Sequence, residues 1–294
     1  PYCGSDRAIA YRTIDNGRRG VNAYGSFEYY FDGGMSWFAD VQLGRQEVRL
    51  LTGTNGNDVV SDHMGWEFHD PLSTDNYREK MFYNQASGHY EVWSRQFSPE
   101  EVGGLTNRMN KTTQKTAAVT TGFKGSFAQD WNWEAAYNHS EYRADVDMPR
   151  IRAAAANELF LGPLLGYDAD GYAIYDADHE RMFRPITPAQ FATIGAMSTF
   201  RPVAKNDNVN FTVDTPALFS MPAGDVGFAG VLEYGRQSYS INPDPLALTE
   251  DAYYGPRYGD GDGSRNRWGA AVELRVPLLS SLQASLAGRY DRYS

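Results

Sequence analysis

Apolar and polar residues alternate along several stretches of this chain. Between Phe211 and Tyr239, two such runs meet at a tight turn, Met221–Asp225. In each run, every second position (we call such a set of positions one parity) is mainly apolar. These residues are Phe211, Val213, Ala217, Phe219, Val226, Phe228, Leu232 and Tyr234. Leu218 and Val231 interrupt the alternation. Because successive side chains of a strand point to opposite faces, a period of two predicts a hairpin with one apolar and one polar face.

The same pattern predicts three further hairpins, over residues 21–44, 115–140 and 267–291. In the first, Gly33 and Gly34 provide the positive φ angles that a tight turn needs. The last is the most regular, and its apolar parity comprises Trp268, Ala270, Val272, Leu274, Val276, Leu282, Ala284, Leu286 and Tyr290. The sequence therefore predicts about eight long strands in four hairpins.

The connections between strands fall into two length classes. Turns within a hairpin are a few residues long, whereas the segments 51–114, 147–206 and 242–264 lack alternation and are predicted to be long, mostly irregular loops. Outer-membrane barrels have short periplasmic turns and long extracellular loops, while a soluble β-sandwich has no reason to separate its loops by length. The predicted fold class is therefore all-β, an antiparallel transmembrane β-barrel segment.

Three short helices are predicted inside the loops. Ser98 and Glu101 have the spacing of a capping box. Arg152–Phe160 and Pro188–Ala196 have weaker helical patterns, and Thr187 is the expected N-cap of the second.

Composition narrows the possible partners. The net charge of −10 and the lack of a basic stripe argue against nucleic acid as a partner. No apolar run reaches the roughly 18 residues of a spanning helix. The chain has 20 tyrosine residues, and such rings are typical of proteins that cross a membrane–water boundary.

Cys3 is the only cysteine, so an internal disulfide is excluded. No targeting signal opens the chain, and it stops at Ser294 inside an alternating run, so we expect it to be a piece of a longer protein.

Candidate catalytic and metal-binding groups are sparse. Asp168–Gly171 and Asp260–Gly263 are similar to the start of a calcium loop but lack its later ligands, so we interpret them as polar turns. The histidines lack the spacing of a helical metal site: His63, His69, His89, His139 and His179. Neither a Gly-x-Ser-x-Gly elbow nor a phosphate-binding loop is present. We therefore expect no catalytic residue, no metal ligand and no cofactor, and we expect that the protein is not an enzyme.

Two groups of side chains have a predicted role in the wall or the loops. Four charged residues lie on the polar parity and are expected to form a hydrogen-bonded network: Glu233, Glu273, Arg275 and Arg289. Four aromatic residues lie in the long loops: Trp66, Trp93, Tyr253 and Tyr254. Such rings either form platforms for sugars and flat chelates or pack on each other. Both interpretations stay open, and the substrate-binding residues are unknown.

Several passages in the C-terminal part resemble the barrel of TonB-dependent outer-membrane receptors. They are Leu218–Gly224, Val226–Tyr234, Pro243–Leu246, Glu273–Leu279 and Ala287–Ser294. Met221 stands where the family pattern has a small aliphatic residue. The resemblance implies that residues 1–294 belong to the receptor's β-barrel domain and contain no plug domain.

The resemblance also implies a function, namely TonB-coupled active uptake of a scarce solute across the outer membrane of a Gram-negative bacterium. The implied partners are outer-membrane lipid, TonB (reached through a region N-terminal to this chain), and a small solute such as a ferric siderophore, cobalamin or an oligosaccharide. Three alternatives stay open: a passive porin-like channel, an outer-membrane barrel enzyme and a soluble secreted β protein.

Overall fold

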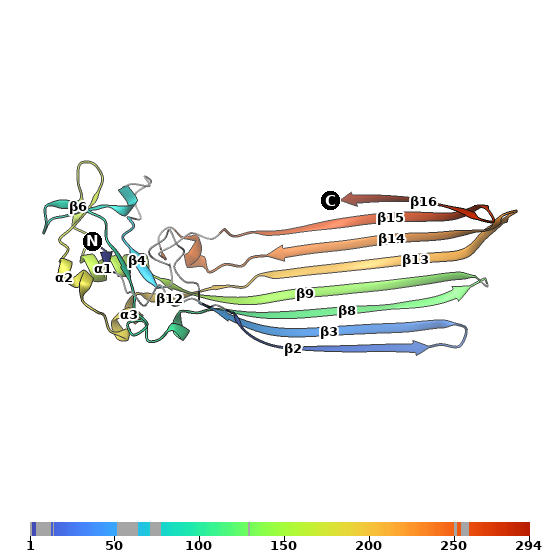
Figure 1. The fold of residues 1–294 in the computed structure, drawn as a ribbon, viewed down its shortest axis with the longest axis horizontal. Helices are drawn as coiled ribbons and strands as arrows, with labels where there is room; N and C mark the ends of the chain where they lie inside the picture. The colour runs from blue at the N-terminus through green and yellow to red at the C-terminus, as the bar shows by residue number, and fades with distance from the viewer. Residues whose placement is uncertain are drawn as a thin grey trace.

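One large antiparallel sheet dominates the computed structural model of the chain (Figure 1). The structure describes residues 2–3, 13, 15–51, 64–70, 78–128, 130–249, 252–253 and 259–294. Its eight long strands are β2 (Gly17–Tyr30), β3 (Met35–Leu50), β8 (Asn110–Phe127), β9 (Trp131–Ile151), β13 (Val203–Met221), β14 (Gly224–Ser240), β15 (Asp262–Leu279) and β16 (Leu282–Tyr293).

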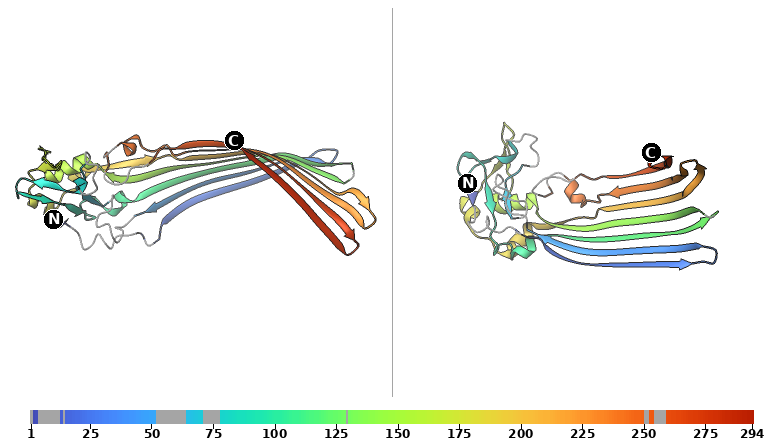
Figure 2. Two further views of the ribbon diagram at one scale, coloured as in Figure 1. Left: turned by 90° about the horizontal axis from the view of Figure 1, so that it is seen from above. Right: turned by 45° about the vertical axis from the view of Figure 1, so that its right-hand side comes forward.

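The long strands form the four predicted hairpins, which confirms a largely all-β, mostly antiparallel fold. Their order across the sheet is β16-β15-β14-β13-β9-β8-β3-β2, and β12 (Gly195–Phe200) adds a ninth strand beside the far end of β9. The sheet is twisted and curved (Figure 2). It is also open, because β2 and β16 are its two edges and do not pair with each other in the described part of the chain.

All four hairpin turns lie at one end of the sheet, on the right in Figure 1. Gly33 and Gly34 have φ angles of 100° and 83°, as their place in the first turn predicts. Met221 pairs with Gly224, so only two residues connect β13 to β14. Tight turns of this kind fix the register of each hairpin.

Most long strands extend beyond their predicted ends, always toward the end opposite the turns. β9 continues to Ile151, β8 begins at Asn110 and β15 begins at Asp262. In the extensions of β8 and β15, polar residues occupy both parities, whereas on β9 the apolar residues Tyr142, Ala144, Val146 and Met148 fall on the parity opposite to that of Trp131 and Tyr137. The apolar parity of the predicted hairpins therefore does not continue into the extensions, although the backbone ladder does.

Strand pairing joins the apolar parities of all eight long strands into one face. Directly paired residues along one row are Tyr29, Trp37, Phe123, Ala135, Phe211, Leu232, Ala270 and Tyr290. Many large side chains on this face are exposed in the chain alone, including Leu232 at 59%, Leu286 at 62% and Tyr290 at 68%. The sheet thus has a continuous apolar face that no described residue covers.

The apolar rows occupy only the turn-side part of the strands. On β8 they run from Phe127 back to Ala117, and Lys115 and Lys111 then take the same parity. On β9 they run from Trp131 to Tyr137, and Glu141 and Arg143 follow. Charged residues therefore end the apolar band well before the strands end.

Two of the three segments predicted to be irregular loops, 51–114 and 147–206, contribute most of their described residues to a compact unit at the end opposite the turns (Figure 1). We call this unit the cap; it consists of the described residues of 64–109 and 152–194, together with β1. Its elements are β1 (Tyr2–Cys3), β4 (Gly65–Glu67), β5 (Phe82–Asn84), β6 (His89–Glu91), β7 (Ser94–Gln96), α1 (Ala153–Leu161), β10 (Gly166–Tyr167), β11 (Ala173–Tyr175), α2 (His179–Phe183), α3 (Pro188–Ile194) and the 3-10 helices η2 (Arg78–Lys80) and η3 (Leu105–Arg108). A further 3-10 helix, η4 (Pro245–Leu248), lies in the third long connection.

Two sequence segments interlock in the cap. β11 pairs in parallel with β5, and the small sheets have the orders β10-β11-β5-β6 and β1-β7-β4. Both segments contribute to one apolar core, in which Trp66, Phe82 and Phe160 are 0% exposed. The indole Nε1 of Trp66 donates to Asn157 Oδ1 at 2.9 Å across this core. Neither segment could bury its aromatic rings without the other.

A buried ion pair joins the two segments as well. The Arg95 guanidinium, 2% exposed, pairs with Glu101 and also donates to the Met182 carbonyl. The Glu101 carboxylate accepts from the backbone N–H groups of Ser98 at 2.8 Å and Ile186 at 2.9 Å. Further hydrogen bonds to both partners offset the desolvation of this pair.

The predicted helices have mixed outcomes. α1 and α3 confirm two of them, and the Thr187–Gln190 capping box at α3 is formed in both directions. The third prediction is wrong, because residues 98–101 form only a turn. Its capping box is present, but Gly103 and Gly104 have φ angles of 72° and 104° and end the turn. None of the helices described is long and apolar enough to cross a bilayer.

Truncation of the cap core should unfold the cap without opening the sheet. We expect Phe160→Ala to destabilise the cap by about 3–5 kcal/mol, because it removes a fully buried ring and leaves a cavity. Phe183→Ala is the matched control on α2, since that ring is 51% exposed, and it should cost under about 1 kcal/mol. Denaturant titration followed by tryptophan fluorescence would measure both. Equal destabilisation would contradict the assignment of the core.

Candidate functional site

A hollow of about 810 Å³ lies on the polar face of the sheet, in the half of the strands nearer the cap. Two registered rows of side chains line it. The first contains Thr116, Tyr142, Ala204, Tyr239 and Gly263, and the second contains Gln42, Ala118, Ser140, Asn206, Gln237 and Arg265. The hollow therefore spans six neighbouring strands, from β3 to β15.

The size of these residues explains the depression. Ala204 lies directly between Tyr142 and Tyr239, and Ala118 lies beside Ser140 in the next row. Small side chains at the centre leave space that the flanking tyrosine rings border. The hollow is thus a product of the sequence on this parity as well as of the curvature of the sheet.

The lining is mostly uncharged and rich in hydrogen-bonding groups. Its one basic side chain on the polar parity, Arg265, donates through Nε to Gln237 Oε1 at 2.9 Å and lies 5.3 Å from the Tyr293 ring centroid. Glu141 and Lys205 also border the hollow, but they have the opposite parity and pair with each other at 3.3 Å. Amides, hydroxyls and phenol rings can hydrogen-bond and stack on a neutral polar molecule.

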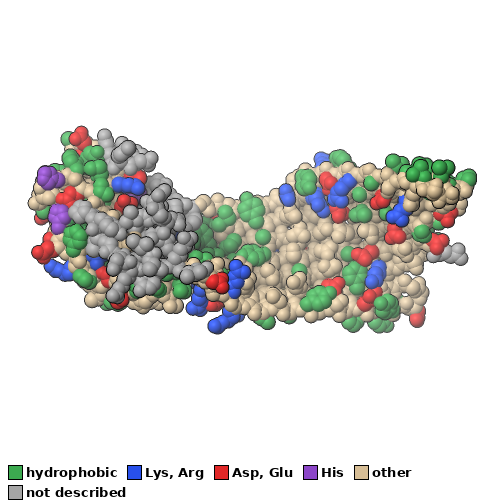
Figure 3. Space-filling view, viewed as in Figure 1, with side chains coloured by type: hydrophobic (Ala, Val, Ile, Leu, Met, Phe, Trp, Pro, Cys, Tyr) green, Lys and Arg blue, Asp and Glu red, His purple; other side chains and the backbone are tan. Residues whose placement is uncertain are grey.

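A charged network lies on the same face, closer to the turns. Glu233 Oε2 accepts from Arg267 Nη2 at 3.1 Å and also from Arg289. Arg289 in turn makes a two-bond contact with Asp291, at 2.8 Å and 3.0 Å. Acidic and basic side chains are intermixed on the visible face of the sheet (Figure 3). The predicted bracing network is therefore confirmed for Glu233 and Arg289.

The other two residues of that prediction lie nearby. Glu273 accepts a hydrogen bond from Ser285 at 2.9 Å instead of contacting an arginine. Arg275 lies two residues along β15 and directly opposite Ser285 in register. All four residues share the polar face, as their parity predicts.

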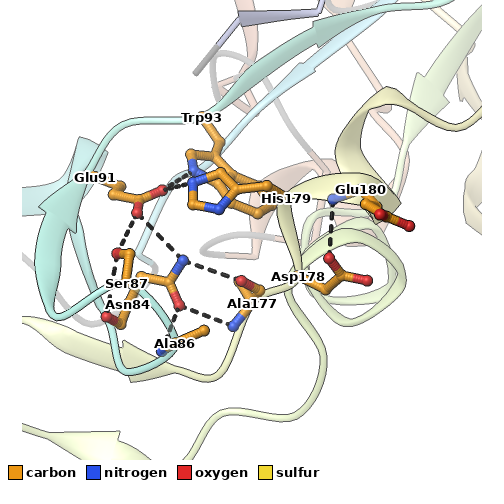
Figure 4. A network of polar contacts seen from close by, with 9 residues as sticks. All are labelled: Asn84, Ala86, Ser87, Glu91, Trp93, Ala177, Asp178, His179 and Glu180. Atoms are coloured by element: carbon orange, nitrogen blue, oxygen red, sulfur yellow. Dashed lines mark hydrogen bonds and ion pairs between the residues drawn. The ribbon is translucent and has the colours of Figure 1, made fainter.

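A second polar network holds the cap together around Glu91 (Figure 4). One carboxylate oxygen accepts from Ser87 Oγ and from Asn84 Nδ2 at 3.3 Å. The other accepts from the Trp93 indole and lies 2.9 Å from His179 Nε2. Ser87 and His179 thus contact opposite sides of one carboxylate rather than each other. The arrangement fastens the β5–β6 hairpin to α2 and gives the histidine no hydroxyl to activate.

Electrostatics in the cap follow from these contacts. Burial raises the pKa of Glu91, but hydrogen bonds from Ser87 and Trp93 and the charge of His179 outweigh it, so the pKa lies below its usual value. The hydrogen bond from Tyr90 to Asp168, 2.6 Å long, raises the pKa of Tyr90 to about 12. Both groups therefore keep fixed protonation states near neutral pH.

The structure decides between the two interpretations for the aromatic loop residues that it describes. Trp66 and Trp93 are 0% exposed and pack in the cap core, so they are not platforms in this fold. Tyr253 is half-buried and donates to Asp244 at 2.8 Å. Tyr254 lies outside the described residues.

Asp168 and Asp260 each begin a segment that the sequence predicts to be a polar turn. Asp168 Oδ1 accepts from the backbone N–H groups of Asp170 and Tyr172, both at 2.9 Å, which is the geometry of a polar turn. Asp260 Oδ1 accepts from the N–H of Gly261 at 2.8 Å. No group of three or more metal-ligating side chains occurs within the described ranges. His63 and the side chain of Cys3 lie outside those ranges.

One partly exposed aromatic cluster was missed from the sequence. Tyr83, Tyr90 and Tyr172 contact in series on the cap, with ring centroids 5.3 Å and 4.8 Å apart. Strand pairing across β5 and β6 brings two of them together, and the third comes from a loop far along the chain. Only the parallel pairing of β11 with β5 could have revealed this proximity.

Comparison with protein-family models and with curated proteins finds no match to this chain.

Acid should loosen the cap through Glu91. Its pKa is lower in the folded state, so its stabilising effect is complete above the unfolded value of about 4.5 and is lost as pH falls below it. We expect Glu91→Gln to cost about 1–3 kcal/mol at pH 7 and to reduce the acid dependence. Hydrogen exchange of cap amides at pH 7 and pH 3.5 would measure this.

The matched control for that variant is Glu180→Gln on α2. The Glu180 side chain is 80% exposed, and its partner Arg184 is the C-cap residue of the same helix. This substitution should leave both the stability of the cap and its pH dependence nearly unchanged. An identical effect of the two substitutions would assign the acid response to overall charge instead of Glu91.

Proposed function

We propose that this chain forms part of the wall and outer surface of a TonB-dependent receptor in a Gram-negative outer membrane. The receptor would take up a scarce small solute. The apolar face of the sheet contacts lipid, the polar face lines a wet interior, and the cap is extracellular. The resemblance of the C-terminal passages to this family motivates the family assignment, and the fold supports the membrane part of it.

One observation carries the membrane part of the proposal: the apolar band is confined to one face and has a limited length. On β2 it covers residues 21–29, on β8 residues 117–127 and on β15 residues 268–276. A tilted strand needs about 9–11 residues to cross a hydrocarbon core. A soluble sheet would instead need a second layer against these exposed side chains.

The distribution of turns and loops supports the same orientation. Short turns lie at one end, and the folded cap lies at the other. Barrels of outer membranes have this asymmetry, with their elaborated loops outside the cell. The hollow on the polar face then lies between the cap and the charged network, where an entering solute would pass. Its uncharged lining favours a neutral, polar solute such as an oligosaccharide over a highly charged chelate.

An arginine on the apolar face should be far more harmful than one on the polar face. Leu286 and Ala287 are neighbours on β16 with opposite parity, and Ala287 lies directly opposite Glu273. We expect Leu286→Arg to cost about 2–4 kcal/mol in a bilayer and Ala287→Arg much less. Urea unfolding of the protein inserted in phosphatidylcholine vesicles would measure both. Equal costs would contradict the assignment of the two faces.

Filling the hollow should reduce solute uptake. Ala204→Trp places a large ring between Tyr142 and Tyr239, whereas Val203→Trp puts the same ring on the opposite face. We expect the first variant to lower uptake about tenfold, equivalent to a clash of roughly 1–3 kcal/mol, and the second to leave uptake unchanged. Uptake of ferric siderophores, cobalamin and maltodextrins by cells expressing the receptor would be compared.

The same assay separates active transport from passive diffusion. Cells that lack TonB should show no uptake of the transported solute. Uptake that is independent of TonB but still sensitive to Ala204→Trp would indicate a passive channel instead.

A further inference from the structure

A second hollow, of about 480 Å³, lies on the apolar face of the sheet, across β2, β3, β8 and β9. It lies at the end of the apolar band nearer the cap. The part of the hollow nearer the turns is formed by three apolar residues that lie opposite one another in the strand register, Ala23, Leu43 and Ala117. Leu43 is 51% exposed, so the row is open to the surroundings. Apolar and charged residues therefore meet inside one depression on the face proposed to contact lipid.

Three cations form the next row toward the cap. In the strand register, Arg45 lies directly opposite Lys115, and Lys115 lies directly opposite Arg143, on three neighbouring strands. All three line the hollow, together with the single acid Glu141. Like charges directly opposite each other destabilise a sheet, so this row carries an electrostatic cost in the chain alone.

Nearby acids compensate this row only in part. Arg143 pairs with Glu141, and Lys115 Nζ lies 3.9 Å from Asp145 Oδ2. Arg45 forms no hydrogen bond or ion pair with another residue in the described part of the chain. By contrast, the next registered cation pair, Arg49 and Lys111, shares Glu47 at 2.7 Å and 3.8 Å.

We propose that the Arg45–Lys115–Arg143 row binds the phosphate groups of a phosphorylated lipid in the surrounding leaflet. The acyl chains of that lipid lie along Leu43 and Ala117. The argument is charge complementarity at a fixed depth: the cations begin where the apolar rows stop, and a phosphorylated lipid has its anionic groups directly above its chains. A free phosphate would use the cations but not the apolar part of the hollow. The inference rests on the proposed membrane location.

The test uses the full protein, inserted into phosphatidylcholine vesicles with or without added lipid A, a diphosphorylated acylated disaccharide. Bound lipid A is counted by native mass spectrometry after mild extraction. We expect the wild type to retain lipid A, and Arg45→Gln/Lys115→Gln to bind it at least about tenfold more weakly, since each basic residue near a lipid surface contributes measurably.

The matched control is Arg49→Gln/Lys111→Gln, which removes the same charge from the same two strands four residues closer to the cap. This variant should retain lipid A like the wild type. Equal loss in both double variants, or loss in neither, overturns the proposal. Displacement of lipid A by millimolar inorganic phosphate would show a site that needs no acyl chains, and it also overturns the lipid assignment.

The vesicle assay separates this inference from the proposal on which it rests. Insertion of the wild type into phosphatidylcholine alone supports the membrane location. Insertion without retention of lipid A overturns the phosphate site only. Failure to insert into either kind of vesicle overturns both.

Discussion

The backbone ladder of the long sheet is the constraint on which every other feature depends. Each residue of a strand must face one of two sides, and a slip of one residue would exchange the two faces completely. Tight turns at one end fix the register, so the apolar parities of eight strands, from β2 to β16, align into one continuous face. This register brings together the residues that form both hollows, the charged network and the row of cations. None of them is formed by a single segment of the sequence.

The cap shows a different kind of stabilisation. It has short strands and short helices. Its stability comes from a shared aromatic core and from buried polar groups that form ion pairs and hydrogen bonds with one another. The carboxylates of Glu91 and Glu101 each accept hydrogen bonds from groups in different segments of the chain. A carboxylate used in this way cross-links loops that have few backbone bonds between them. The long sheet therefore supports a rigid surface instead of a set of independent loops.

Sequence reasoning found the sheet because its signal is local. Alternation between Phe211 and Tyr239, or the glycines at 33 and 34, needs only neighbouring residues to be interpreted. The strand extensions were missed because the apolar parity breaks off: on β9 it ends at Tyr137, and Glu141 and Arg143 then occupy the same parity. The cap was missed because its decisive pairing, β11 with β5, joins residues 173 and 82. A helix was predicted at 98–101 from a real capping box, but the two glycines that follow it ended the turn.

The same limits explain the outcome for the candidate site. Parity alone placed Glu233 and Arg289 on one face, and their contact followed from it. The hollow could not be predicted in the same way, because it depends on which small residues come into register across six strands. Trp66 and Trp93 could have been either surface or core residues on sequence grounds. Burial by rings from the distant α1 segment, such as Phe160, decided the matter.

The parallel pairing of β11 with β5 has a consequence for the order of biogenesis. About ninety residues separate the paired positions, including the whole β8–β9 hairpin, so prior formation of that hairpin brings the two segments together and lowers the entropic cost of closing the cap. Until then, the rings that later fill the core are exposed and adhesive. Assembly from the wall outward therefore has the lower entropic cost, and a nascent chain stalled before residue 173 would present those rings to any chaperone that accompanies it.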